Sequence, residues 1–368
     1  MKAISLTLVI AMFLVLAYSC DDKTEPEDKP IFTATPYEIE IPPGFPTQLN
    51  IPEDNPMTVE GIALGQMLFY DTRLAGRADE GKFMSCSSCH IQDNSFIIGM
   101  PRPHPFGLDG TSTHHAMLPM INLVWNPGQY GWNGSVASIE EDVLGVITDP
   151  NEFNSTYEKV ENAIREIPGY EDLFIKAFGS KDVTIDRISK AIAQFVRILI
   201  SSDSRFDKYL RGEVQLTQPE LQGFVLFTTE EGADCFHCHG AAGNPLFTTN
   251  LFYNNGKDSV FTDPGDRYSI TGDPMDLGGY KASTLRNIEF TAPYMHDGRF
   301  NTLDEVIDFY AHQLIWSPYI DPLMHHIATG GNQLTSIEKG QLKAFLLTLS
   351  DTSFLHNPNF ASPEEFPN

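Results

Sequence analysis

The residues with the clearest chemistry are two short cysteine and histidine motifs. They read Cys86-Ser87-Ser88-Cys89-His90 and Cys235-Phe236-His237-Cys238-His239. In a Cys-x-x-Cys-His arrangement, two thiols one turn apart add to the vinyl groups of a haem, and the imidazole that follows ligates its iron. The pair of motifs therefore predicts two covalently attached c-type haems, with His90 and His239 as iron ligands.

Other uses of the same thiols are weighed against haem. Two Cys-x-x-Cys pairs could form a tetrahedral zinc site, although zinc ribbons place their pairs much closer in sequence and need no histidine after each pair. A disulfide within each pair would suit an exported protein, but it leaves both histidines unexplained. Two haems account for all six residues.

The N-terminus indicates export from the cytoplasm. Lys2 precedes an apolar run, residues 4–17, which is too short to cross a bilayer comfortably and is typical of a signal segment. The stretch that ends at Ser19-Cys20 resembles a bacterial lipoprotein signal, so we expect residues 1–20 to be the signal and Cys20 to carry a lipid. An ordinary cleaved signal is the alternative. The expected location is the bacterial cell envelope, periplasmic or anchored to a membrane by the lipid.

Composition sets the remaining organisation. Residues 21–48 are rich in Pro, Asp, Glu and Thr, which predicts a flexible tether. The rest is long enough for two domains, which we assign to residues 49–213 and 214–355, followed by a tail at 356–368. A net charge of -25 argues against nucleic acid or anionic lipid as a partner and favours a basic docking protein.

Helices must position the two motifs. Leu64-Gly65-x-x-Leu68-Phe69 precedes the first motif and Gln222-Gly223-x-x-Leu226-Phe227 the second, as expected of a duplicated haem domain. Capping boxes predict helix starts at Ser138, Thr217, Thr302 and Thr335. Apolar residues at helical spacing predict one helix between the motifs and another near the end: Ile185, Ile188, Ile192, Phe195 and Leu199, then Ile337, Leu342, Phe345, Leu346 and Leu349. The expected fold is mainly α, with two cytochrome-c-like haem domains, long loops and little β.

Several further motifs, in order, resemble the bacterial di-haem cytochrome c peroxidases, a family that includes MauG-type enzymes. They are the stretches at residues 63–71, 167–170, 283–287 and 291–298, together with the two haem motifs. The resemblance implies that hydrogen peroxide reacts at the haem of His90. It also implies that electrons enter at the haem of His239 from a small redox protein, a cytochrome c or a cupredoxin. A homodimer is a further expectation.

The resemblance also implies an acid-base group. Asp149-Pro150-Asn151-Glu152 matches the turn that carries the family's catalytic glutamate, so Glu152 is the candidate to move protons on peroxide. A solvated turn carboxylate would have the same local sequence. Ten residues earlier, Asp142 stands where the family usually has glutamine, and we expect like-charge repulsion from it to raise the pKa of Glu152.

A tryptophan occupies the place of the family's tryptophan between the haems. That motif is Trp-Asp-Gly-Arg, whereas this chain has Trp132-Asn133-Gly134-Ser135, so the family's local ion pairing is in question. Trp132 is a candidate electron relay, and a buried anchoring side chain is the simpler role.

The sixth ligand of the second haem differs within the family. Some members have methionine at the position that Tyr310 occupies here, and MauG-type enzymes have tyrosine. A phenolate ligand would hold the potential of this haem low. Because Tyr310 also belongs to an apolar helical stripe, Met295 and His312 stay open as alternative ligands.

Two further sites are less defined. The distal ligand of the first haem could be His104, His114, His115 or none of them. The family also binds calcium, and the resemblance places two backbone carbonyls of that site at Thr291 and Pro293, with a side-chain ligand within residues 114–122.

The function expected from these features is peroxide reduction with electrons from a small redox protein. The alternatives are a MauG-like enzyme that oxidises residues of a partner protein and a di-haem electron carrier without catalytic activity.

Overall fold

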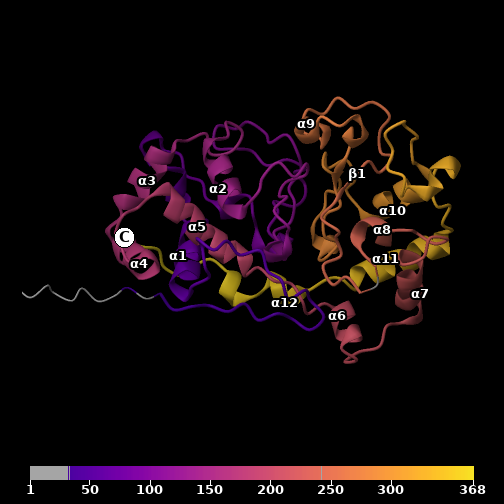
Figure 1. Cartoon of the computed structure of the whole chain (residues 1–368), viewed down its shortest axis with the longest axis horizontal. Helices are drawn as coiled ribbons and strands as arrows, with labels where there is room; N and C mark the ends of the chain where they lie inside the picture. The colour runs from indigo at the N-terminus through magenta and orange to yellow at the C-terminus, as the bar shows by residue number, and fades with distance from the viewer. Residues whose placement is uncertain (1–31, 33, 242) are drawn as a thin grey trace, which may run out of the picture. The chain divides into compact units, whose positions relative to one another are not determined.

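The computed structural model describes residue 32, residues 34–241 and residues 243–368. The expected signal, Cys20 and the first part of the expected tether lie outside these residues. The mainly helical class is confirmed (Figure 1), with the following helices: α1 Val59–Tyr70, α2 Ile139–Thr148, α3 Tyr157–Arg165, α4 Pro168–Phe178, α5 Ile185–Arg197, α6 Arg205–Leu210, α7 Gln218–Phe227, α8 Phe236–His239, α9 Tyr268–Thr271, α10 Leu303–His312, α11 Ser336–Leu347 and α12 Thr352–Leu355.

The described residues contain one small sheet, and their other β pairing consists of isolated bridges. The strands β1 Phe252–Tyr253 and β2 Tyr280–Lys281 pair antiparallel, with Phe252 opposite Lys281. Long loops connect the other elements, as the sequence predicts. None of the helices in the described part of the chain is long and apolar enough to span a membrane.

The two repeated glycine motifs occupy matching positions in two helix pairs. α1 packs on α5, and α7 packs on α11 (Figure 1). A Cβ at Gly65 would lie 1.9 Å from the carbonyl oxygen of Ala191 in α5, and a Cβ at Gly223 would lie 1.9 Å from that of Gln341 in α11. Each helix before a haem motif therefore needs glycine where it crosses its partner, which is consistent with a duplicated unit.

The predicted capping residues begin the predicted helices. Thr217, Thr302 and Thr335 each form a reciprocal capping box with the glutamate three residues later. Ser138 caps α2 by accepting from the Glu141 N–H, but the Glu141 carboxylate accepts from Ala137 N–H instead. These caps fix where four helices start.

The predicted apolar faces form the cores, with one exception. Ile188, Ile192 and Phe195 of α5 are fully buried, as the spacing predicts. Ile337 is 74% exposed, so its inclusion in the buried face of α11 is wrong. It lies in the first turn of that helix, which projects beyond the core.

Two main hydrophobic clusters organise the described chain. The first collects buried residues between Leu64 and Leu199, and the second those between Phe206 and Leu349. Phe354, Leu355 and Phe360 return to the first cluster, and the Tyr70 hydroxyl donates to the Phe360 carbonyl at 2.6 Å. Residues 356–368, expected as a tail, thus pack against α1. Residues 34–368 form one compact unit, and the division into domains at 49–213 and 214–355 stays a prediction.

Part of the expected tether at residues 21–48 contacts the rest of the chain. Most of residues 34–48 are exposed, but Phe45 is only 7% exposed, and its ring lies 5.2 Å from that of Trp125. Trp125 Nε1 donates to the Pro46 carbonyl at 2.8 Å. These contacts hold Phe45 and Pro46 against the chain, and the flexible tether stays a prediction.

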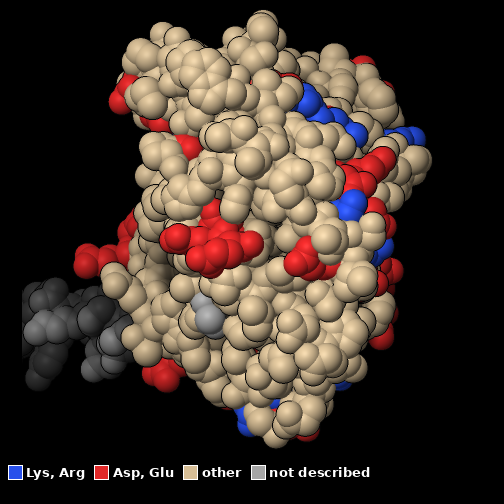
Figure 2. Space-filling model, turned by 90° about the vertical axis from the view of Figure 1, so that its right-hand side faces the viewer, with Lys and Arg blue, Asp and Glu red and all other residues tan. Residues whose placement is uncertain are grey.

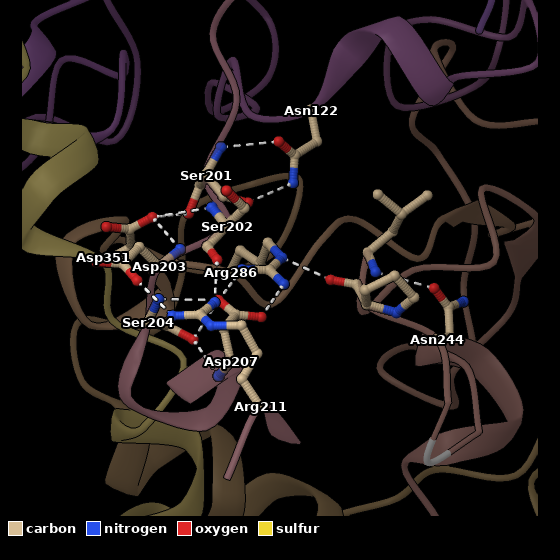
Figure 3. A network of polar contacts seen from close by, with 12 residues as sticks. Asn122, Ser201, Ser202, Asp203, Ser204, Asp207, Arg211, Asn244, Arg286 and Asp351 are labelled. Carbon is tan, nitrogen blue, oxygen red and sulfur yellow. Dashed lines mark hydrogen bonds and ion pairs between the residues drawn. The ribbon is translucent and has the colours of Figure 1, made fainter. Parts of the chain in front are cut away.

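A buried polar network joins the segment between α5 and α6 to both halves of the chain (Figure 3). Asp351 accepts from Ser201 Oγ, Ser202 N–H and Asp203 N–H, and Asn122 exchanges two hydrogen bonds with the Ser201 backbone. Arg286 pairs with Asp207 through two bonds of 2.9 and 2.7 Å. Because these groups are buried and paired, they hold the connection in one arrangement.

Candidate active site

The first Cys-x-x-Cys-His motif forms a short 3-10 turn at Cys86–Ser88. His90 N–H returns to the Cys86 carbonyl at 2.9 Å. His90 Nδ1 lies 2.7 Å from the Phe96 carbonyl oxygen, which can only accept, so Nδ1 carries the proton and Nε2 keeps its lone pair. Burial lowers the pKa of His90 to about 4, so the ring is neutral at pH 7 and suited to bind iron.

The second motif repeats this arrangement. Its residues form α8, and His239 N–H bonds to the Cys235 carbonyl at 3.0 Å. His239 Nδ1 donates to the Ser283 carbonyl at 3.0 Å, and burial lowers the pKa of His239 to about 4. Both imidazoles are therefore neutral, oriented and free at Nε2, which is what an axial haem ligand requires.

A largely apolar cavity adjoins each motif. The first, of about 560 Å³, has Cys86, Cys89 and His90 in its wall, and this volume falls within the range of roughly 300–1,000 Å³ for cofactor sites. The second, of about 200 Å³, has Cys235, Cys238 and His239 in its wall. Its volume lies below that range, so the fit there depends on the donor set: two thiols and one oriented imidazole beside an apolar wall. Both sites fit covalent haem.

A shared zinc site does not fit. The Cys86 pair and the Cys235 pair line different cavities. In the described part of the chain, groups of three or more ligand atoms within 4.8 Å of one another occur only at His114, His115 and Asp263 and at Asp234, His237 and His325. The four thiols do not converge on one ion.

Glu152 and Asp142 both lie in the wall of the first cavity. The turn before Glu152 is fixed by Asn151 N–H on Asp149 Oδ1 at 2.7 Å, and the Glu152 carbonyl accepts from Leu108 N–H at 2.7 Å. Burial, with smaller contributions from the Asp142 and Asp149 carboxylates, raises the pKa of Glu152 to about 7. A group with this pKa can both accept and return a proton near neutral pH.

Asp142 stands on α2 and opens onto the same space. It is exposed and is one of the residues that line the cavity. Burial, with a contribution from Glu141, raises the pKa of Asp142 to about 6. It is therefore mostly ionised at pH 7, and its negative charge opposes ionisation of Glu152.

Trp132 is half-buried and lines both cavities. Its Nε1 donates to the Ala116 carbonyl at 2.7 Å, and its carbonyl accepts from Lys281 N–H at 2.8 Å. Its ring makes an edge contact with His296 at 6.3 Å between centroids. The indole is thus both anchored and positioned where an electron relay between the two sites would be.

The altered motif after Trp132 is stabilised differently from the family pattern. Asn133 Oδ1 accepts from Ser135 N–H at 3.1 Å, and Arg267 Nη1 donates to the Asn133 carbonyl at 2.7 Å. A distant arginine therefore contacts this turn, where the family has an arginine within the motif.

Tyr310 and Met295 both line the second cavity together with His239. The Asn255 amide donates to the Tyr310 hydroxyl at 2.9 Å and lies 3.8 Å from Met295 Sδ. Burial raises the pKa of Tyr310 above its ordinary value, so an unbound side chain would stay a phenol. His312 is exposed and is absent from the cavity wall.

The three histidines considered for the distal side of the first haem differ in where their side chains lie. His114 and His115 reach the cavity wall, but each directs Nε2 at Asp263. His104 is outside the wall, and its buried Nδ1 has no hydrogen-bond partner among the described residues.

The expected calcium site gains no side-chain ligand. Asn122 is the only side chain with an oxygen within residues 114–122, and both ends of its amide bond to the Ser201 backbone. Thr291 is half-buried and Pro293 is buried.

Two residues at these cavities were not predicted. Asn255 lies between recognisable motifs, and nothing local distinguishes it. Lys281 lines both cavities and is buried, and burial lowers its pKa to about 8. The one feature of the sequence that could have pointed to Lys281 is its position just before the Ser283–Asn287 motif.

Comparison with known proteins agrees with this geometry. The sequence profile of the family described as di-haem cytochrome c peroxidase matches residues 59–215. Cytochrome c551 peroxidase of Nitrosomonas europaea is 35% identical over 266 residues, which cover 69% of this chain and 73% of that protein. The methylamine utilization protein MauG of Methylophilus methylotrophus is 28% identical over 83% of this chain and 86% of that protein.

A solved structure matches over nearly the whole chain. The crystal structure of a MauG-like protein associated with microbial copper homeostasis superposes with a TM-score of 0.79 at 33% identity, covering 89% of this chain and 100% of that one.

Proposed function

The chain belongs to the di-haem cytochrome c peroxidase family, and on that premise we propose how its two haem sites divide the reaction. It is a di-haem peroxidase that reduces hydrogen peroxide with electrons from a redox protein. When bound, the haems supply the iron at which the O–O bond is cleaved and the path for two electrons. His90 Nε2 would hold the iron of the first cavity and His239 Nε2 that of the second.

Glu152 is the proposed acid-base residue. Reduction of one hydrogen peroxide consumes two electrons and two protons and yields two waters. The Glu152 carboxylate takes the proton from one peroxide oxygen and returns it to the departing oxygen, so that water leaves in place of hydroxide. The observation that carries this role is its place in the cavity wall beside His90 with a pKa of about 7.

The test is turnover by the full-length holoprotein with hydrogen peroxide and a reduced small cytochrome c. Glu152→Gln should lower kcat/KM by about 10²- to 10⁴-fold. Glu158→Gln, an exposed carboxylate on α3, is the matched control and should leave it unchanged. Turnover by Glu152→Gln within a fewfold of the wild type would remove this residue from the mechanism. Loss of turnover in Glu152→Gln alone excludes the electron-carrier alternative.

A second function is favoured by Tyr310. MauG-like oxidation of residues in a partner protein is supported by a phenol in the wall of the second cavity, where it accepts from Asn255. Electron paramagnetic resonance of the ferric holoprotein discriminates the ligands. A low-spin His-Tyr signal that disappears in Tyr310→Phe supports this function, and a signal that disappears in Met295→Leu but persists in Tyr310→Phe contradicts it.

The donor is proposed to be a cytochrome c or cupredoxin with a basic docking face. Support comes from the net charge of -25 and from groups of acidic side chains near the middle of the face in Figure 2. Added salt should then lower kcat/KM for a basic donor, because it screens the attraction. No salt dependence would contradict the docking mode.

Three expectations stay proposals here. The lipid at Cys20 and location in the cell envelope are tested by Cys20→Ser, which should release the protein from the membrane fraction. Calcium at the Thr291 and Pro293 carbonyls is tested by chelation, which should lower turnover. The homodimer is tested by light scattering of the holoprotein.

A further inference from the structure

Two adjacent histidines converge on one distant carboxylate. His114 Nε2 lies 3.0 Å from Asp263 Oδ1, and His115 Nε2 lies 2.7 Å from Asp263 Oδ2. The three ligand atoms lie within 4.8 Å of one another. Bonds of about 2.0–2.1 Å to a tetrahedral ion place neighbouring ligand atoms roughly 3.3 Å apart, so an ion would require each imidazole nitrogen to move only a few tenths of an ångström from its present distance to the carboxylate.

Two further hydrogen bonds orient the carboxylate of Asp263. Gly265 N–H donates to Asp263 Oδ1 at 2.8 Å, and the Tyr280 hydroxyl donates to Oδ2 at 2.7 Å. Burial alone would raise the pKa of Asp263, but these bonds and the one from His115 outweigh it and lower the pKa. Asp263 is therefore ionised and held in place by outer partners, as metal-binding carboxylates commonly are.

We propose that His114, His115 and Asp263 form a binding site for one divalent late transition-metal ion. Two imidazoles and one carboxylate suit zinc or copper and do not suit calcium, which prefers oxygen ligands. By the general order of divalent affinities, copper binds this set more tightly than zinc. The His114 side chain is 61% exposed, so the ion can enter from solvent and keep a water ligand.

The other histidine and aspartate cluster does not support an independent site. Asp234, His237 and His325 surround the second haem motif, since Asp234 precedes Cys235 and His237 lies between the two cysteines. Asp234 and His325 also line the second cavity. That cluster belongs to the haem site already described.

The proposed ion would lie beside the electron path. His115 precedes Ala116, whose carbonyl anchors Trp132, and its ring contacts His296 at 5.5 Å between centroids. The His296 ring in turn contacts Trp132. A bound cation would thus add positive charge next to the indole that lines both cavities. Neither the peroxidase reaction nor the haem sites require it.

The test is calorimetric titration of the full-length holoprotein with zinc chloride and, separately, copper sulfate. We expect one equivalent to bind at this site, with copper tighter than zinc, and an affinity at least about tenfold weaker in His114→Ala and in Asp263→Asn. His356→Ala is the matched control, because His356 is also an exposed histidine 3.6 Å from a carboxylate. It should bind like the wild type.

The haem absorption spectrum of each variant establishes that the holoprotein is intact. Because the His114 side chain is exposed, His114→Ala leaves no cavity in the hydrophobic core. In the copper-loaded wild type, electron paramagnetic resonance should show nitrogen coupling distinct from the haem signals, and His114→Ala should lose it. Wild-type affinity in His114→Ala would overturn the proposal. The proposal would also be overturned if the wild type did not bind one equivalent of metal. Metal binding that is lost in His325→Ala but retained in His114→Ala would overturn it as well.

Discussion

At the scale of single residues, the cavity of His90 differs from that of His239 in its acid-base groups. The first has Glu152 and Asp142 in its wall, and burial raises the pKa of both. The second has Tyr310 and Met295 in its wall; an unbound Tyr310 would keep its proton near neutral pH because its pKa is raised, and methionine has no proton to exchange. The proposed division of roles between the two haems rests on this difference between the groups that line the cavities.

Replacing Asp142 should shift the pH dependence of peroxide reduction. Glu152 must be ionised to accept a proton, so kcat/KM rises with pH through its pKa of about 7. In Asp142→Asn a neighbouring negative charge is lost, ionisation of Glu152 becomes easier, and its pKa falls. The rising limb of the pH–rate profile should move to lower pH. An unmoved limb would show that Asp142 does not act on Glu152.

Replacing Trp132 should slow electron transfer between the haems. Trp132→Phe keeps an aromatic ring but loses the Nε1 bond to Ala116 and the more readily oxidised indole. Stopped-flow reduction of the oxidised holoprotein should show slower re-reduction of the first site, with both haems still attached. Trp316→Phe, at a 65% exposed position, is the control. Equal rates in both variants would leave Trp132 with only an anchoring role.

At the scale of elements, each haem motif follows a helix that crosses its partner at glycine. Gly65 of α1 and Gly223 of α7 leave no space for a side chain because a backbone carbonyl lies opposite. The repeated sequence is thereby explained by packing.

Adding one methyl group at these crossings should destabilise the fold. Gly65→Ala and Gly223→Ala should each lower the free energy of unfolding by about 1–3 kcal/mol, because the helices must move apart. Gly340→Ala in α11 meets nothing within 4 Å, so it should be neutral or stabilise by about 0.5–1 kcal/mol. Urea unfolding of the holoproteins measures both. Equal effects of Gly65→Ala and Gly340→Ala would contradict close packing at α1 and α5.

Local signals predicted the elements better than the long-range contacts. The haem motifs, four helix starts and the buried face of α5 could be read from the sequence because each depends on neighbouring residues. The meeting of His115 with Asp263, and of Asn255 with Tyr310, could not, since only the loops that fold over the cavities bring them together. The contact of Phe45 with Trp125 could not be predicted for the same reason, because the two residues lie far apart in the sequence.

At the scale of the whole molecule, a fully paired network connects the parts that carry the two haem motifs (Figure 3). Arg286 is completely buried, and its partner Asp207 is 6% exposed. Burial alone would raise the pKa of Asp207, but the bonds from Arg286 lower it. Such a pair is strongly destabilising when only one partner is removed. We expect this buried network to hold the two cavities at a constant distance, so that Trp132 lines both.

Both cavities require a haem attached to their own pair of cysteines. Intact mass spectrometry of the mature protein, made alongside a working cytochrome c maturation system, tests this. We predict the mass of two covalently added haems, with one missing in Cys86→Ala/Cys89→Ala and the other missing in Cys235→Ala/Cys238→Ala. A colourless wild-type protein without the mass of two porphyrins would contradict the central claim.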